Sequence, residues 1–108
     1  MIELTQKTHQ ELEASTSPEI RDFVRREGLA ALTHKAVVLI GELFPKPCGI
    51  VWEVSRDPEE SVQWLVLRVT STAPRAELTA AYWQYIQRWV RETPADKRHL
   101  VRLSYSNP

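Results

Sequence analysis

Two prolines near the middle of the chain, Pro45 and Pro47, separate two different hydrophobic patterns. Proline has no backbone N–H and clashes with the preceding helical turn, so a helix that approaches these positions has to end. Before them, apolar residues recur at intervals of three and four, which is typical of amphipathic helices. After them, apolar residues alternate with others, as in Ile50, Trp52 and Val54, which is typical of strands. The chain is therefore neither all helix nor all strand, and it is predicted to be an α+β protein.

The part before the prolines is predicted to contain two helices, over residues 18–27 and 29–44. Ser17 followed by proline is a helix start, since the serine oxygen can accept a bond from a free backbone N–H and proline suits the first turn. The apolar stripe after Gly28 lies roughly opposite the stripe before it, and glycine readily takes the left-handed conformation that ends a helix. The alternative is one continuous helix over 18–44 that is buried on two sides, for example by a dimer partner.

A β-hairpin is predicted next, with strands over 49–54 and 62–69 joined by a polar turn over 56–60. Trp52 and Trp64 are expected to face one another, or the same core, across this hairpin. Both sides of the second strand are largely apolar, so we expect it to be central in the sheet and covered on both faces.

The rest of the chain is predicted to form one helix and one strand. The helix covers about 74–93 with Thr72 as its N-cap, and a last alternation gives a strand over 99–105. The predicted element order is α-α-β-β-α-β, with a three-stranded, mainly antiparallel sheet packed against helices. The last strand either lies antiparallel beside the first, in the order 2-1-3, or pairs in parallel beside the second. Either arrangement leaves the sheet with two open edges. Open edges favour a homodimer formed by edge pairing, and the helical segment that is apolar on two sides is an alternative interface.

Length and composition indicate one domain. The 108 residues are predicted to form a single α+β domain over 17–108, preceded by a mobile and mostly polar arm over 1–16. The 14 basic and 14 acidic residues give a formal net charge of zero, which excludes the large basic excess of non-specific nucleic-acid binders. No apolar run is long enough to span a membrane and no signal peptide is recognisable, so we expect a cytoplasmic protein with no membrane partner.

No pattern of residues points to catalysis, to a metal or to a cofactor. The single cysteine, Cys48, is a candidate nucleophile with His34 or His99 as its base, but a lone cysteine at a strand start is more typical of a small buried side chain. The histidines are far apart without carboxylates at ligand spacing, and the glycines form no phosphate-binding motif. We therefore expect no catalytic residue, metal ligand or cofactor, with a small enzyme whose site is shared across a dimer interface as an alternative.

A tryptophan and a group of arginines near the C-terminal end give the candidate partner-binding site. Trp83 lies at the margin of the apolar stripe of its helix with Val90 near it, so it is either a lid over the edge of the sheet or an anchor for a partner. The arginines form either a charged rim around that anchor or a solvated helix end that complements the helix dipole. The predicted partner-binding residues are Trp83, Val90, Arg88, Arg91, Arg98 and Arg102.

Two binding functions follow from these residues. The first hypothesis is a small non-enzymatic binding protein that acts through protein–protein contacts as a homodimer. The second is an RNA-binding module that uses the basic cluster, because arginine and lysine pair with phosphates. The element order over 29–105 also resembles that of type II KH-like RNA-binding domains, which implies RNA binding. The chain has no GXXG loop, and one helix over 74–93 stands where those domains have a pair.

Overall fold

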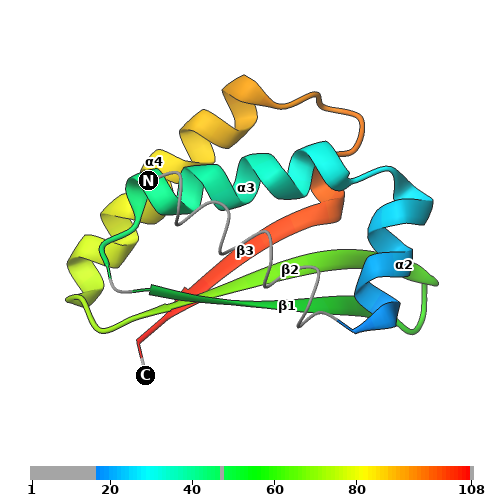
Figure 1. Cartoon of the computed structure of the whole chain (residues 1–108), viewed down its shortest axis with the longest axis horizontal. Helices are drawn as coiled ribbons and strands as arrows, with labels where there is room; N and C mark the ends of the chain where they lie inside the picture. Colours follow the sequence, from blue (N-terminus) through cyan, green and yellow to red (C-terminus); the bar gives the residue numbers. More distant parts are fainter. Residues whose placement is uncertain (1–16, 47, 108) are drawn as a thin grey trace.

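The computed structural model describes residues 17–46 and 48–107, and this part of the chain folds into a sheet of three strands with α3 and α4 packed on one of its faces (Figure 1). The predicted arm over 1–16 lies outside the described residues. The α+β class and the order α-α-β-β-α-β are confirmed. The elements are α2 (Pro18–Glu27), α3 (Ala30–Leu43), β1 (Cys48–Asp57), β2 (Val62–Ser71), α4 (Arg75–Glu92), the 3₁₀ helix η1 (Arg98–Leu100) and β3 (Val101–Ser106).

Gly28 ends α2, and the two predicted helices are separate. Gly28 has φ 67° and ψ 42°, in the left-handed region that glycine reaches without a steric cost. The N–H of Leu29 donates to the carbonyl of Val24 at 2.9 Å, the long-range bond of a Schellman helix end. The ammonium group of Lys97 donates to the carbonyl of Glu27 and satisfies another free acceptor of the last turn. The alternative of one continuous helix is therefore wrong.

The sheet has the order β1-β2-β3. β1 and β2 form the predicted antiparallel hairpin, and β3 pairs in parallel with β2. Of the two predicted positions for the last strand, the structure has the one beside the second strand, and the order 2-1-3 is not formed. Helix α4 has 18 residues. At about 1.5 Å per residue it carries the chain back to the end of the sheet where β2 begins, and β3 reaches the free edge of β2 by a short connection.

The two faces of β2 have different environments. Trp52 of β1 pairs with Leu67 of β2, whereas Trp64 is three residues away from Leu67 and pairs with Ser55. Since side chains alternate along a strand, the two tryptophans lie on opposite faces, and the expectation that they share a core is wrong. β2 is central as predicted, but α3 and α4 cover only one of its faces (Figure 1). The side of β2 that faces these helices is almost fully buried and consists of Leu65, Leu67 and Val69.

The helix starts agree with the prediction at α2 and differ at α4. The Ser17 hydroxyl accepts a bond from an N–H of the first turn of α2 at 3.4 Å, as expected of an N-cap. Thr72 does not cap α4, because the helix begins after Pro74 without a side-chain cap. The Ser71 hydroxyl accepts a bond from the Ala73 N–H at 3.1 Å and shapes the turn instead.

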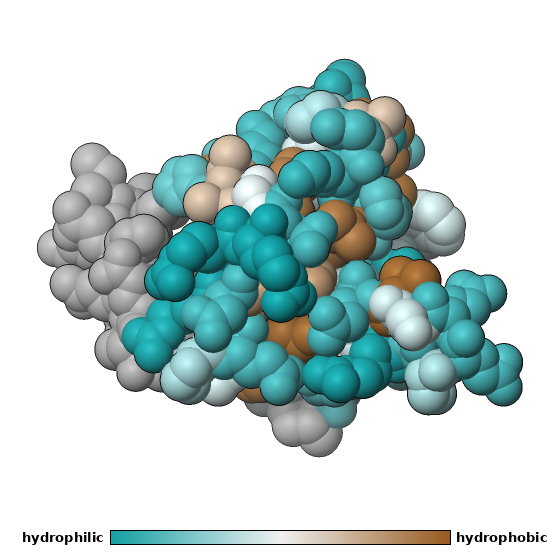
Figure 2. Space-filling view, turned by 90° about the vertical axis from the view of Figure 1, so that its right-hand side faces the viewer, coloured by the Kyte–Doolittle hydropathy of each residue, from teal (hydrophilic) through white to brown (hydrophobic). Residues whose placement is uncertain are grey.

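The end of the molecule that carries α2 has a mainly hydrophilic surface (Figure 2). Apolar residues show there only as small, separate patches. α2 turns Ile20 and Phe23 inward to the core and leaves Asp22 and Arg25 at the surface. Among the described helices there is also none that is long and apolar enough to cross a membrane. This end therefore offers no broad apolar surface to a partner.

Replacing Gly28 with alanine is expected to lower the free energy of unfolding by about 1 kcal/mol, because a Cβ atom is disfavoured in the left-handed region. Urea unfolding followed by circular dichroism measures the change. The matched control is Gly41→Ala in α3, where φ lies outside the left-handed region and alanine should keep or raise the stability. Equal destabilisation by both variants would show that the Gly28 conformation is not what ends α2.

Candidate functional site

The outer side of α4 carries a row of small and apolar residues that stay partly or largely exposed. Trp83 and Val90 are its large exposed side chains, with 59% and 49% of their surface exposed. The row repeats at alternating intervals of three and four residues, the spacing with which two helices pack along a narrow seam. We call this row the α4 seam, and its members are Ala76, Thr79, Trp83, Ile86 and Val90.

The α4 seam lies beside β3. The hydroxyl groups of Thr79 and Tyr105 are 3.1 Å apart, and the rings of Tyr82 and Tyr105 have their centres 5.1 Å apart. Trp83 packs edge-on against Tyr82, with ring centres 5.8 Å apart. β3 is an edge strand of the described sheet, and among the described residues only its β2 side is paired. We call the seam together with the outer edge of β3 the α4–β3 surface.

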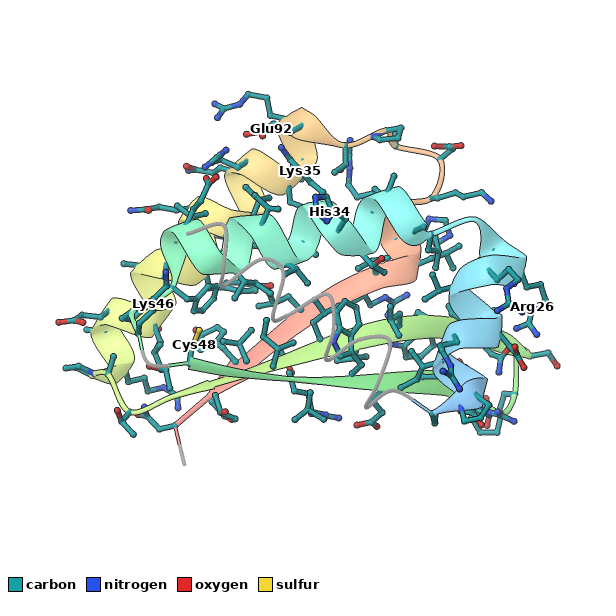
Figure 3. All side chains as sticks on the ribbon, viewed as in Figure 1. Arg26, His34, Lys35, Lys46, Cys48 and Glu92 are labelled. Atoms are coloured by element: carbon teal, nitrogen blue, oxygen red, sulfur yellow. The ribbon has the colours of Figure 1, made fainter. Side chains whose placement is uncertain are left out.

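Arg88 is not part of a free basic rim, because it joins α4 to α3. Its guanidinium contacts Glu42 at 2.6 Å and Glu92 at 2.7 Å, and Glu92 also contacts Lys35 at 2.6 Å. Figure 3 shows Lys35 and Glu92 close together between the two helices. Hydrogen bonds from Arg88 and then from Lys35 lower the pKa of the Glu92 carboxyl to about 2. These four residues form an ionic clamp between α3 and α4.

The other three arginines of the predicted site lie in different places. The side chain of Arg91 is 72% exposed and makes only a loose contact with Glu92, at 3.7 Å. Arg98 donates to the hydroxyl of Thr93 at 3.1 Å and also to its carbonyl, and so closes the end of α4. Arg102 lies on the face of the sheet that is turned away from α3 and α4. The predicted residues that share the exposed side of α4 are Trp83, Val90 and Arg91.

The face of the sheet turned away from α3 and α4 holds a second candidate site that sequence reasoning missed. The guanidinium of Arg102 lies over the ring of Trp64, 4.2 Å from its centre, and its Nε–H donates to the carbonyl of His99 at 3.0 Å. Beside it, Arg68 pairs with Glu53 at 2.8 Å. The sequence prediction places Trp64 in a core because its strand is rich in apolar residues. Arg68 indicated the opposite orientation. It lies on the same side of the strand as Trp64, and arginine rarely faces a core.

The structure does not bring Cys48 together with His34 or His99. Cys48 pairs with Ser71 at the end of β2, whereas His99 lies next to the start of β3, which pairs with Leu65. Leu65 and Ser71 are six residues apart along β2, which corresponds to about 20 Å. His34 projects from α3, away from Cys48 (Figure 3). No nucleophile–base pair is formed by these three residues.

Neither the thiol nor the carboxylates offer an obvious reactive centre. Burial raises the pKa of the Cys48 thiol, and the charge of Lys46 opposes this shift only in part. The thiol is therefore protonated at neutral pH and a weak nucleophile. Within residues 17–46 and 48–107, no three histidine, cysteine or acidic side chains are grouped so that they could hold a metal ion.

An open cleft of about 280 Å³ lies between the end of α3 and the first half of α4. Ligand pockets in proteins usually have volumes of roughly 300–1,000 Å³ and enclose most of the ligand. The cleft is slightly smaller than that range and open to solvent, so it does not enclose a ligand as most ligand pockets do. Its lining residues are Leu43, Phe44, Pro45, Glu77, Ala80, Ala81 and Gln84.

Replacing Glu92 with glutamine is expected to lower the melting temperature at pH 7 and to flatten its pH dependence in acid. The pKa of Glu92 falls from 4.5 to about 2 in the folded chain, so its contribution is fully present above pH 4.5 and is lost as the pH falls toward 2. Thermal unfolding from pH 7 to pH 2 measures both effects. Glu60→Gln in the exposed β1–β2 turn is the control. Identical pH profiles for the native chain and Glu92→Gln would contradict the clamp.

Comparisons with known proteins do not assign the chain to a family. No family model matches it, and no curated protein and no solved structure matches it either. The function therefore has to be argued from the surfaces and side chains of the chain itself.

Proposed function

We propose that this chain is a non-enzymatic protein-binding module and that it binds another polypeptide through the α4–β3 surface. The observation that carries the proposal is the exposure of Trp83 and Val90 in the α4 seam, whose Thr79 contacts Tyr105 of the edge strand β3. Large side chains exposed singly are common on proteins, but an exposed tryptophan in a periodic seam is not. Tryptophan is also enriched among the residues that dominate binding energy at protein interfaces.

The chemistry of the α4–β3 surface suits a β-strand as the bound segment. An open strand edge presents backbone N–H and C=O groups in a row, and another strand satisfies them in register. The apolar side chains above that edge then cover the added strand. Tyr82, Ile86, Leu103 and Tyr105 are only partly buried in the chain alone and would be covered further by such a partner. Arg91 stands at the end of the seam as a charged rim residue.

The remaining chemistry of the described residues supports a binding role over catalysis. The thiol of Cys48 is held protonated, and neither His34 nor His99 lies beside it. The carboxylate with the most strongly shifted pKa, Glu92, is engaged by two cations in the ionic clamp. A strongly shifted carboxylate that is neutralised in this way serves the packing of α3 against α4.

A photoreactive benzoylphenylalanine at Gln87, next to the α4 seam, is expected to form a covalent adduct with a polypeptide in cells that express the protein. Gln87 is exposed and outside the seam, so its replacement leaves the seam intact. The adduct is expected to disappear when Trp83→Glu is added, because a buried charge opposes binding. Mass spectrometry of the purified adduct identifies the partner and the linked segment.

The control for this experiment is the same photoreactive residue at Arg25 of α2, whose side chain is 79% exposed at the hydrophilic end of the molecule. No specific adduct is expected from that position. The proposal fails if Gln87 gives no adduct, or if the adduct is formed equally from Arg25 or in the presence of Trp83→Glu.

A second candidate function, binding of single-stranded RNA, is favoured by the pair of Trp64 and Arg102 on the face of the sheet that is turned away from α3 and α4. Aromatic rings and arginine planes on an open sheet are surfaces on which bases stack, and arginine also pairs with phosphate. Glu53 on this face is neutralised by Arg68. Arg102 has no carboxylate partner among the described residues, so it is available to an anion.

If this second function is correct, Arg102→Ala is expected to weaken binding of a labelled single-stranded RNA several-fold in a fluorescence anisotropy titration. The affinity should also fall steeply between about 50 and about 200 mM salt, because each phosphate contact releases counterions. Arg75→Ala is the matched control, an exposed arginine at the start of α4 that follows the opposite end of β2 from Trp64 and should leave binding unchanged. Binding that ignores salt, or equal losses in both variants, would rule this function out.

A further inference from the structure

We infer that the partner bound by the α4–β3 surface is a second copy of this chain, joined by antiparallel pairing of the two β3 strands across a two-fold axis. The inference rests on the proposed function, that this surface binds a polypeptide. Pairing of a strand with its own copy in the antiparallel sense automatically produces two-fold symmetry, the commonest symmetry of protein dimers.

The side chains of β3 fit such pairing in both central registers. The apolar residues Val101, Leu103 and Tyr105 share the face that is covered by helices, and Arg102 shares the other face with two serines. In antiparallel strands, directly opposite residues point to the same face. When the centre of symmetry is at residue 103, Arg102 stands opposite Ser104 of the second copy. When it is at residue 104, Arg102 stands opposite Ser106 of the second copy. Neither register places like charges directly opposite one another.

The α4 seam supports the same two-fold axis. The axis runs perpendicular to the sheet, so it also sets the two α4 helices antiparallel and on the same side of the joined sheet. In an antiparallel helix pair with this spacing, Trp83 packs near Ile86 of the second copy and Val90 near Thr79 of it. The seam has no charged member, so two copies meet there without electrostatic repulsion. A single two-fold rotation thus produces a dimer in which both the open edge of β3 and the exposed Trp83 are covered.

The opposite edge of the sheet fits a second copy less well. β1 contains three charged residues, Glu53, Arg56 and Asp57, and charges on an edge strand oppose further pairing. α2 packs against β1 at one end of the sheet, whereas the α4 seam lies beside β3 (Figure 1). Pairing through the β3 edge therefore joins the three-stranded sheets of two copies into one continuous sheet.

Engineered disulfides test the geometry. In a Cys48→Ser background, Leu103→Cys and Ser104→Cys are prepared separately. One of the two is expected to cross-link into a covalent dimer under mild oxidation, because the residue at the centre of symmetry faces its own copy within disulfide range. Ser106→Cys lies too far from its own copy in both registers and serves as the first control. Glu53→Cys reports on pairing through β1 and serves as the second.

Analytical ultracentrifugation of the native chain tests the association itself. The purified protein is expected to sediment as a dimer at concentrations of tens of micromolar. Trp83→Glu is expected to weaken the dimer by about tenfold or more, since an anchor at the interface is lost. Gln84→Glu, an exposed neighbour outside the seam, is the control and should leave the dimer unchanged. Circular dichroism checks that both variants remain folded.

The outcomes separate this inference from the proposed function. A monomer at all concentrations, or a dimer that cross-links through Glu53→Cys and through neither β3 variant, overturns the self-pairing. If the photoadduct from Gln87 then contains a different protein, the protein-binding function still stands. If the purified chain is monomeric and Gln87 gives no adduct, both fail. A dimer that cross-links through β3 and is weakened by Trp83→Glu supports both.

Discussion

Burial of one face of β2 beneath α3 and α4 sets the positions of the other described elements. Leu65, Leu67 and Val69 supply the side of the central strand that faces these helices, so alternation sends Trp64 and Arg68 to the opposite side. β1 and β3 then have to pair in registers that keep their own apolar residues on the helical side. The connection from β2 through α4 to β3 leaves α4 beside the edge strand, with Thr79 of the seam in contact with Tyr105.

Three of the arginines predicted to bind a partner stabilise the fold instead. Arg88 belongs to the ionic clamp between α3 and α4, Arg98 closes the end of α4, and Arg102 covers Trp64. The planar guanidinium suits all three tasks, because it offers several directed donors and a flat face that stacks on aromatic rings. Three arginines of the basic cluster in the sequence are therefore engaged in three separate structural contacts, and the surface that we propose for a partner is apolar.

The two candidate surfaces lie on different sides of the molecule, so use of one leaves the other free. The α4–β3 surface joins the helical layer to an edge of the sheet, and the pair of Trp64 and Arg102 lies on the face turned away from α3 and α4. If two chains pair through β3, these faces of the two copies become parts of one wider face. Arg102, near the centre of β3, would then lie close to the two-fold axis, so dimer formation brings two copies of this positive group together.

Local chemistry was enough to predict the elements and their order. The start of α2 at Ser17, its end at Gly28 and the change from helix to strand near Pro45 each depend on residues only a few positions apart. The exposure of Trp83 at the margin of its helix was visible in the sequence as an open choice between a lid and an anchor. The sequence did not show the strand order, the side of β2 that is turned away from α3 and α4, or the partners of the arginines. Each of these depends on residues far apart in the chain. Trp64 has the same neighbours in sequence whether it faces a core or solvent, and only the packing of α3 and α4 on the opposite face decided between them.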